Sequence, residues 1–265
     1  MVGSSCDTTR RVTTRFARAV LAAGLLACVS CAASAAAESH EITVGAAASL
    51  SVVFQQIGHA FERAHPGTTV RFTFSSSNGL ATQIQQGAPI DVFASAAPRW
   101  LDAVEKDPGV LARADFARNR LIVIVPRDNA AHIARFGDLA RTGVRLVLAA
   151  PGVPAGDYAR QALSNAGLHR ALRNVVSNEQ DVEGVVGKVS SGDADAGIVY
   201  ATDVTPSVAR SVGTVPVPEE DNVVAVYDIG VVRGTKAAAL ARAFVAYVTG
   251  AGEAILHRAG FEASA

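Results

Sequence analysis

Two spacings of apolar residues alternate along the chain, one typical of strands and the other typical of helices. A first strand is expected at 41–44, and the helix after it has the apolar face Leu50, Val53, Phe54, Ile57 and Phe61. Later strands are expected at 70–74, 89–94, 121–125, 145–149, 197–200 and 223–232, and later helices are expected to begin near 80, 98, 157, 182, 237 and 253. Strands that alternate with helices in this way predict an α/β fold with mainly parallel sheets.

The length of 265 residues favours two lobes over one. The chain starts a new unit near Leu121, and the strand at 223–232 is placed to return it to the first unit. We therefore expect lobe 1 to comprise 38–121 plus 226–265 and lobe 2 to comprise 122–225, joined by two hinge strands.

The first 37 residues have the pattern of a secretory signal peptide: arginines, then the apolar run 19–29, then small residues up to Ala37. All three cysteines lie in this segment, so a chain cleaved after Ala37 has no disulfide and no thiolate ligand. Residues 25–28 also resemble a lipobox, in which Cys28 would carry a lipid. Both routes predict an exported protein, either free in the periplasm or anchored through Cys28.

Several kinds of chemistry are disfavoured by the sequence. Basic and acidic residues are balanced at 24 each, which argues against a nucleic-acid-binding surface. The six histidines show no HxH or HExxH spacing, so no site for a metal cation is expected. GxSxG, GxGxxG and GxxxxGK[ST] motifs are absent, which argues against a nucleophilic enzyme and against nucleotide binding.

What remains is a group of helix-starting turns with small or hydroxyl residues, together with a tyrosine at a strand end. They are Ser49, Ser77, Ala155, Val182 and Tyr200. Each turn alone could be structural, and Ser49 in particular could be an N-cap. Together they present hydroxyl and backbone N–H donors without a lysine or arginine, which favours binding of an unprotonated oxyanion.

The residues that carry these turns also resemble a known family, over 41–261. The matching segments are ITVGAAASL at 42–50, FSSSNGLATQIQQGAPIDVFASA at 74–96, VPAGDYARQAL at 153–163, EQDVEGVVGKV at 179–189 and GIVYATD at 197–203. In this order and spacing, they are similar to the periplasmic molybdate-binding receptors of bacterial ABC importers. The resemblance implies a two-lobed, type II-like periplasmic binding protein that is not an enzyme.

By the same resemblance, the oxyanion ligands in lobe 1 are Ser49 and Ser77, with Ser76 as the neighbouring alternative. The ligands in lobe 2 are the amides of Ala155 and Val182 and the hydroxyl of Tyr200, while Asp181 is expected to be a helix cap. The expected ligand is molybdate or tungstate, with no cofactor, and the expected partner of the monomer is an ABC permease. A receptor of the same fold for another oxyanion such as sulfate is the alternative, followed by an enzyme on a receptor-like fold.

Overall fold

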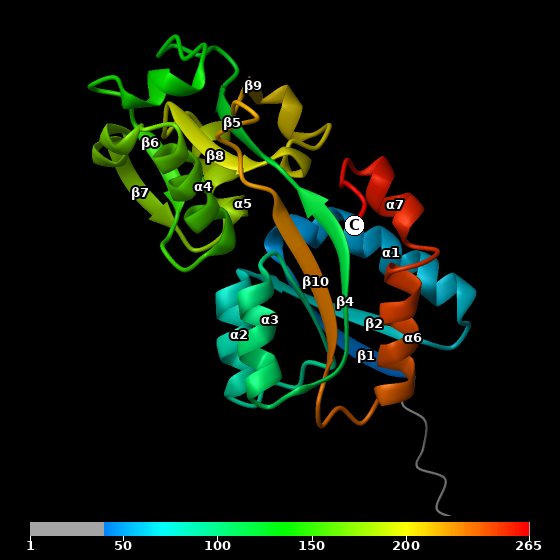
Figure 1. Ribbon diagram of the computed structural model, residues 1–265. Coiled ribbons are helices and arrows are strands. Elements are labelled where there is room, and N and C mark those ends of the chain that lie inside the picture. The colour runs from blue at the N-terminus through cyan, green and yellow to red at the C-terminus, as the bar shows by residue number, and fades with distance from the viewer. Residues whose placement is uncertain (1–39, 265) are drawn as a thin grey trace, which may run out of the picture. The chain divides into compact units, whose positions relative to one another are not determined.

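The computed structural model describes residues 40–264, so the expected signal segment, the three cysteines and the lipobox lie outside the described residues. The described chain contains two five-stranded sheets, each flanked by helices (Figure 1). No helix within residues 40–264 combines the length and the apolar character that crossing a membrane requires.

The first sheet has the strand order β2-β1-β3-β10-β4. Strand β1 pairs in parallel with β2 and β3, whereas β10 is antiparallel to both β3 and β4. Four of the five strands therefore run in the same direction. The strands are β1 (Glu41–Ala47), β2 (Thr69–Ser75), β3 (Val92–Ser95), β4 (Val110–Asn119) and β10 (Ala225–Val232).

The second sheet repeats this plan with the order β7-β6-β8-β5-β9. Strand β6 pairs in parallel with β7 and β8, and β5 is antiparallel to β8 and β9. The prediction of two mainly parallel sheets is thus confirmed. The strands are β5 (Leu121–Pro126), β6 (Leu146–Ala149), β7 (Val175–Glu179), β8 (Ala196–Tyr200) and β9 (Val212–Pro216).

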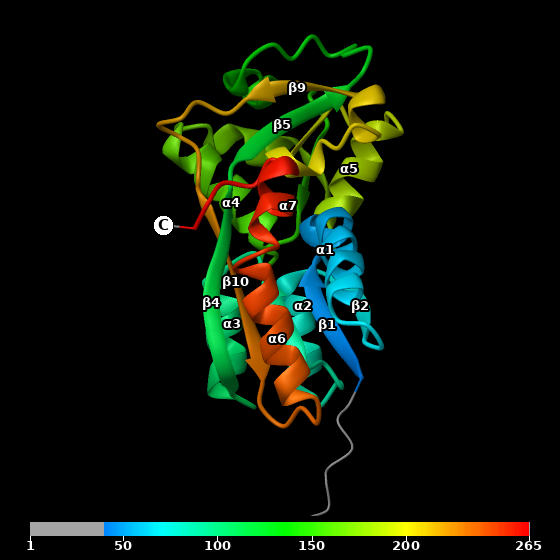
Figure 2. The same cartoon turned by 90° about the vertical axis from the view of Figure 1, so that its right-hand side faces the viewer.

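Helices cover both faces of the first sheet, with α2 and α3 on one side and α1 and α6 on the other (Figures 1 and 2). Helices α4 and α5 pack on the second sheet. The α-helices are α1 (Ser51–Ala64), α2 (Ser77–Gln85), α3 (Pro98–Lys106), α4 (Pro154–Asn165), α5 (Val182–Ser190), α6 (Ala238–Val248) and α7 (Glu253–Arg258). Short 3₁₀ helices are η1 (Ala48–Leu50), η2 (Phe136–Ala140), η3 (His169–Asn174), η4 (Ala201–Asp203) and η5 (Val208–Arg210).

The apolar face predicted for the first helix is buried along its whole length. Phe54 and Phe61 both meet the ring of Phe244 on α6 edge-on, and Phe54 also contacts Phe116 on β4. Full burial of each such side chain contributes roughly 1.5–3 kcal/mol. Packing of α1 therefore fixes the helix against the sheet, and with it the turn at the end of β1.

Two chain crossings connect the sheets. The first runs from β4 through Arg120 directly into β5, and the second returns through 217–224 to β10. Asn222 ties the crossings together, because its side chain accepts from the N–H of Leu121 (3.0 Å) and donates to the carbonyl of Leu121 (2.9 Å). The sheet memberships support our proposal of lobes at 38–121 plus 226–265 and at 122–225.

Some elements differ from the sequence prediction. Strands β4, β7 and β9 were not expected, because β4 has the charged residues Arg113 and Asp115 at alternate positions, and β7 and β9 are five-residue segments with valine as their only large apolar residue. The expectation that a helix begins at Asp157 was wrong: α4 begins at Pro154, since proline is accommodated in the first helical turn, where no N–H partner is needed. The sequence of the tail predicts a helix over 253–261, but the last helix, α7, ends at Arg258.

Close packing of α4 on the end of β6 leads to a first prediction. A Cβ on Gly156 would lie 2.3 Å from the carbonyl oxygen of Ala149, so Gly156→Ala should lower the free energy of unfolding by about 1–3 kcal/mol. A Cβ on Gly187 of α5 would meet no atom within 4 Å outside its own helix, so Gly187→Ala should raise that free energy by roughly 0.5–1 kcal/mol. Urea unfolding curves measure both changes, and equal midpoints for the two variants would contradict this account of α4.

Candidate functional site

A small cavity of about 20 Å³ lies between turns that follow strands of the first sheet and turns that follow strands of the second sheet. Pockets for organic ligands usually have volumes of roughly 300–1,000 Å³, so this cavity has the scale of a single small ion. All five residues predicted from the sequence line the cavity, as does the alternative Ser76. The complete lining is Ala47, Ala48, Ser49, Ser76, Ser77, Ala96, Val153, Pro154, Ala155, Asp181, Val182 and Tyr200.

Ser49 lies in η1, the single 3₁₀ turn between β1 and α1. The interpretation of Ser49 as an N-cap was wrong, because the residue at the N-cap of α1 is Leu50, the residue at the N-cap of η1 is Ala47, and neither helix start has a side-chain cap. Its hydroxyl is instead 2.9 Å from the hydroxyl of Tyr227 on β10. A hydrogen bond to a side chain of β10, which is separated from β1 by β3 in the sheet, thus holds Ser49 at the cavity.

Ser77 is the first residue of α2, and Ser76 is the residue that precedes this helix. The hydroxyl oxygen of Ser77 accepts a hydrogen bond from the backbone N–H of Ala96 (3.0 Å). Because a hydroxyl has one proton and its oxygen is already an acceptor here, the proton of Ser77 is available to another acceptor. Ser77 is also more deeply buried than Ser76, at 1% against 9% exposure.

Ala155 and Val182 contribute the first turns of α4 and α5 to the cavity. N–H groups in a first helical turn have no partner within the helix and carry partial positive charge. The expectation that Asp181 caps α5 is confirmed, since its carboxylate accepts from the N–H of Gly184 (3.0 Å). That cap leaves the amide of Val182 to the cavity.

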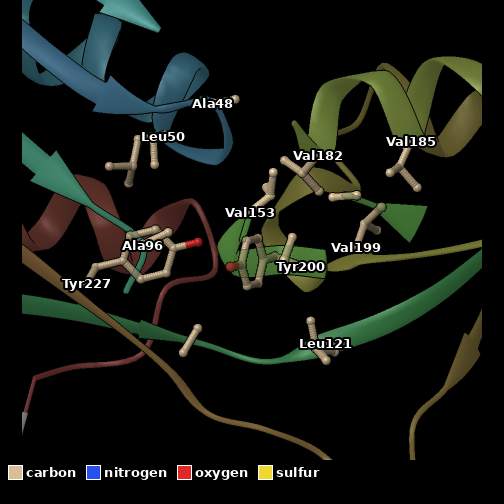
Figure 3. Close-up of a cluster of buried hydrophobic side chains, with 14 of the residues drawn as sticks. Ala48, Leu50, Ala96, Leu121, Val153, Val182, Val185, Val199, Tyr200 and Tyr227 are labelled. Carbon is tan, nitrogen blue, oxygen red and sulfur yellow. The ribbon is translucent and has the colours of Figure 1, made fainter. Parts of the chain in front are cut away.

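Tyr200 ends β8 and is almost completely buried, with 1% exposure. Its hydroxyl has no hydrogen-bond partner among the described residues, which is unusual for a buried polar group. Burial raises the pKa of Tyr200 well above its usual value, so the hydroxyl keeps its proton. Figure 3 shows this hydroxyl and that of Tyr227 pointing toward one another.

The cavity is lined without any lysine, arginine or histidine among the described residues. The same part of the chain contains no cluster of histidine, cysteine and acidic side chains that could hold a metal ion. Two serine hydroxyls, a tyrosine hydroxyl and the N–H groups of helix starts can all donate hydrogen bonds. The site can therefore surround an anion with donors, and it supplies no cation to neutralise it.

Hydrogen bonds and an ion pair join helices of the first sheet to elements of the second sheet on both sides of the cavity. The hydroxyl of Ser51 on α1 donates to the carboxylate of Glu183 on α5 (2.7 Å). On the other side, the indole N–H of Trp100 on α3 donates to the carbonyl of Gly152 (3.1 Å), and Arg99 pairs with Asp157. These contacts hold the two groups of elements together around the cavity.

A larger groove of about 560 Å³ adjoins the cavity and shares Ala48 and Ser49 with it. It lies between the start of α1, α5, residues 201–208 and residues 258–261. Glu183 and Asp203 place acidic groups in this groove, with Arg258 as its basic group. Its mixed charge makes it less suited to an anion than the cavity of donors.

Sequence reasoning did not identify Tyr227, Trp100 or Arg99 as parts of the site region. Tyr227 occupies a buried position in an expected strand, and its partner Ser49 is 178 residues away in sequence. No local spacing could connect the two residues. The Arg99 and Trp100 contacts likewise depend on the meeting of α3 with the turn before α4.

Comparison with known proteins gives a consistent set of relatives. Residues 42–262 match the family described as bacterial extracellular solute-binding proteins. The chain is 43% identical over 258 residues to the molybdate-binding protein ModA of Mycobacterium tuberculosis strain H37Rv, covering 94% of this chain and 97% of that protein.

Solved structures share the fold. The periplasmic molybdate-binding protein of Azotobacter vinelandii superposes with a TM-score of 0.76 at 23% identity, covering 84% of this chain and all of that one. The sulfate-binding protein SubI of Mycobacterium tuberculosis superposes with a TM-score of 0.74 at 17% identity, covering 84% of this chain and 86% of that one. The fold alone is thus shared by proteins named for different oxyanions.

The buried acid Asp203 is hydrogen-bonded to the backbone of Tyr200. The carboxylate of Asp203 accepts from the N–H of Tyr200 (2.8 Å). Burial raises the pKa of Asp203 to about 8, and the Tyr200 N–H opposes that rise only in part. The carboxyl is therefore neutral below about pH 8 in the folded protein, whereas it ionises near 3.8 when the chain unfolds.

This difference predicts a pH dependence of stability. Between about pH 4 and pH 8 the folded state keeps a proton that the unfolded state releases, so the free energy of unfolding should fall as pH rises. Asp203→Asn retains an acceptor for Tyr200 and removes the titration, so its stability should decline less over this range. Urea unfolding at pH 5 and pH 8 measures both declines.

Asp228, whose pKa burial raises to about 7, should cause a residual decline in the variant. An identical decline in the wild type and in Asp203→Asn would contradict the assignment of a neutral Asp203.

Proposed function

Because the chain belongs to the molybdate-binding proteins of the bacterial extracellular solute-binding family, we propose that it captures molybdate and delivers it to an ABC importer. Family membership makes it a binding protein and not an enzyme. Tungstate, with the same charge and nearly the same size, is expected to bind as well. The oxyanion is cargo, and no cofactor takes part.

The observation that carries this proposal is the convergence of five expected donors on one ion-sized cavity. Ser49 and Ser77 come from the first sheet's turns, and the amides of Ala155 and Val182 and the hydroxyl of Tyr200 come from the second's. Tyr200 supports the proposal most strongly, because its buried hydroxyl has no acceptor among the described residues. An oxyanion in the cavity would provide that acceptor.

Neutral donors can suffice to hold a dianion here. A hydrogen bond to a charged group contributes roughly 1.5–3 kcal/mol, and helix N-termini add a favourable field. A fully deprotonated oxyanion uses all of its oxygens as acceptors, whereas a protonated one would direct an O–H at a donor. The site therefore favours molybdate, tungstate and sulfate over phosphate, whose ordinary forms at neutral pH carry a proton.

We propose that binding is coupled to closure of the two lobes about the crossings at Arg120 and 217–224. Ligand groups come from both lobes, so the full set of contacts exists only when the lobes are together. The Ser51–Glu183 contact and the Arg99–Asp157 pair would form in the same step. The closed monomer would then dock transiently on a membrane permease.

Export follows from the same proposal. The family description places its members outside the cell membrane, and the sequence of residues 1–37 supplies a signal for that route. Cleavage after Ala37 would release a periplasmic protein, and processing at Cys28 would anchor it by lipid.

Calorimetric titration tests the ligand. We expect tight, saturable binding of molybdate and tungstate by the purified protein, with sulfate weaker and phosphate weakest. Phosphate should be weakest because it carries a proton at neutral pH, and molybdate should bind more tightly than sulfate because the relatives of this chain are molybdate-binding proteins. Tight sulfate binding with no heat from molybdate would contradict the proposal and favour the sulfate alternative.

Removal of the Tyr200 hydroxyl tests its role as a ligand. Tyr200→Phe should weaken molybdate binding by roughly 1.5–3 kcal/mol, the scale of one hydrogen bond to a charged group. The matched control is Tyr247→Phe, which deletes a hydroxyl on α6 away from the cavity and should bind like the wild type. Equal affinities for the two variants would remove Tyr200 from the site.

A further inference from the structure

The single proton of Ser49 can point in only one of two directions. The oxygens of Ser49 and Tyr227 are 2.9 Å apart, and either hydroxyl could donate to the other. If Ser49 donates to Tyr227, the serine presents only lone pairs to the cavity and repels an anion. If Tyr227 donates, the proton of Ser49 is free for the ligand.

The surroundings of Tyr227 favour the second arrangement. Tyr227 is completely buried on β10, and burial raises the pKa of its hydroxyl, so it keeps its one proton. Its hydroxyl oxygen is also 3.5 Å from the side-chain nitrogen of Asn119 at the end of β4. An amide nitrogen can only donate, so Tyr227 is the acceptor on that side.

The orientation of the Asn119 amide is fixed by two other bonds. Its oxygen accepts from the N–H of Arg120 (2.9 Å), and its nitrogen donates to the hydroxyl oxygen of Thr202 (2.7 Å). A flipped amide would place the oxygen away from the Arg120 N–H and lose that bond. The donor face of Asn119 is therefore turned toward Tyr227.

We propose that Tyr227 is a positioning residue that makes Ser49 a hydrogen-bond donor to the bound oxyanion. Asn119 donates to Tyr227, Tyr227 donates to Ser49, and Ser49 donates to the ligand. The inference rests on the proposed function, since it assigns a direction to one of the proposed ligands. Tyr227 touches Ser49 without lining the cavity itself.

Ser77 provides an internal parallel for this arrangement. Its hydroxyl oxygen accepts from the backbone N–H of Ala96, a group that can only donate, and this leaves the serine proton for the cavity. Tyr227 would do for Ser49 what the Ala96 amide does for Ser77. Both serines of the first lobe would then face the anion as donors.

A double-mutant cycle tests the proposal, with molybdate affinity measured by calorimetry on the purified protein. Tyr227→Phe removes the donor that holds the Ser49 hydroxyl, so the serine proton is no longer fixed toward the ligand, and the Kd should rise about 3- to 10-fold. In a Ser49→Ala background the same change should alter the Kd less than about twofold, because there is no serine proton left to direct. Tyr247→Phe, a hydroxyl deletion outside the site, should leave the Kd unchanged.

A second variant provides a test that does not require the Tyr227→Phe protein to fold. Asn119→Asp preserves shape and the acceptor for Arg120 but replaces the donor toward Tyr227 with an acceptor. It should weaken binding more strongly in the presence of Ser49 than in the Ser49→Ala background. Its added charge acts in both backgrounds and cancels in the comparison.

The proposal would be overturned if Tyr227→Phe and Asn119→Asp raised the Kd by the same factor in the Ser49→Ala background as in the wild type. It would also be overturned if Tyr227→Phe left the Kd unchanged. A wild-type protein that binds sulfate but not molybdate would overturn the proposed ligand alone, and the same cycle run with sulfate would then decide the role of Tyr227. A wild type that binds neither oxyanion would overturn both.

Discussion

Hydrogen-bond donation by uncharged groups is the interaction on which the site of this protein depends. The cavity brings together hydroxyls and helix-start amides, and no basic side chain lines it among the described residues. Removing a dianion from water is costly, and without a cation the cost must be offset by many well-directed donors. Direction therefore matters as much as proximity. A serine whose proton points the wrong way would be a repulsive group and not a ligand.

The fold supplies both the donors and their direction. Helices α2, α4 and α5 begin at the ends of strands and present their first turns to the cavity, while η1 holds Ser49 against β10. Gly156 allows α4 to lie on the carbonyls at the end of β6, where a larger residue would push the helix away. The packing of the scaffold thus sets the positions of amides that have no side chain to adjust.

The two crossings connect this site to the lobe closure that we propose. Residues from both lobes line the cavity, and Asn222 joins the crossing at Leu121 to the returning segment. Asn119 and Tyr227 lie beside these crossings, on the last residue of β4 and near the start of β10. The proposed orientation of Ser49 therefore depends on the two strands that adjoin these crossings.

The sequence predicted the parts of this account that depend on local pattern. The spacing of Phe54, Ile57 and Phe61 identified the buried face of α1, and Asp181 was correctly expected to cap α5. The start of α4 was misplaced because proline at position 154 is as typical of a turn as of a first helical residue. Tyr227 could not be found, because its importance comes from contacts with Ser49 and Asn119 that only the folded sheet creates.

The most direct measurement is a crystal structure of the protein with molybdate. The anomalous signal of molybdenum identifies the position of the metal atom independently of the interpretation of the electron density. We expect one strong peak, placed so that the oxygens of the oxyanion lie within hydrogen-bonding distance of Ser49, Ser77, Ala155, Val182 and Tyr200. A peak in the larger groove beside Glu183 and Asp203, with the small cavity empty of molybdenum, would contradict it.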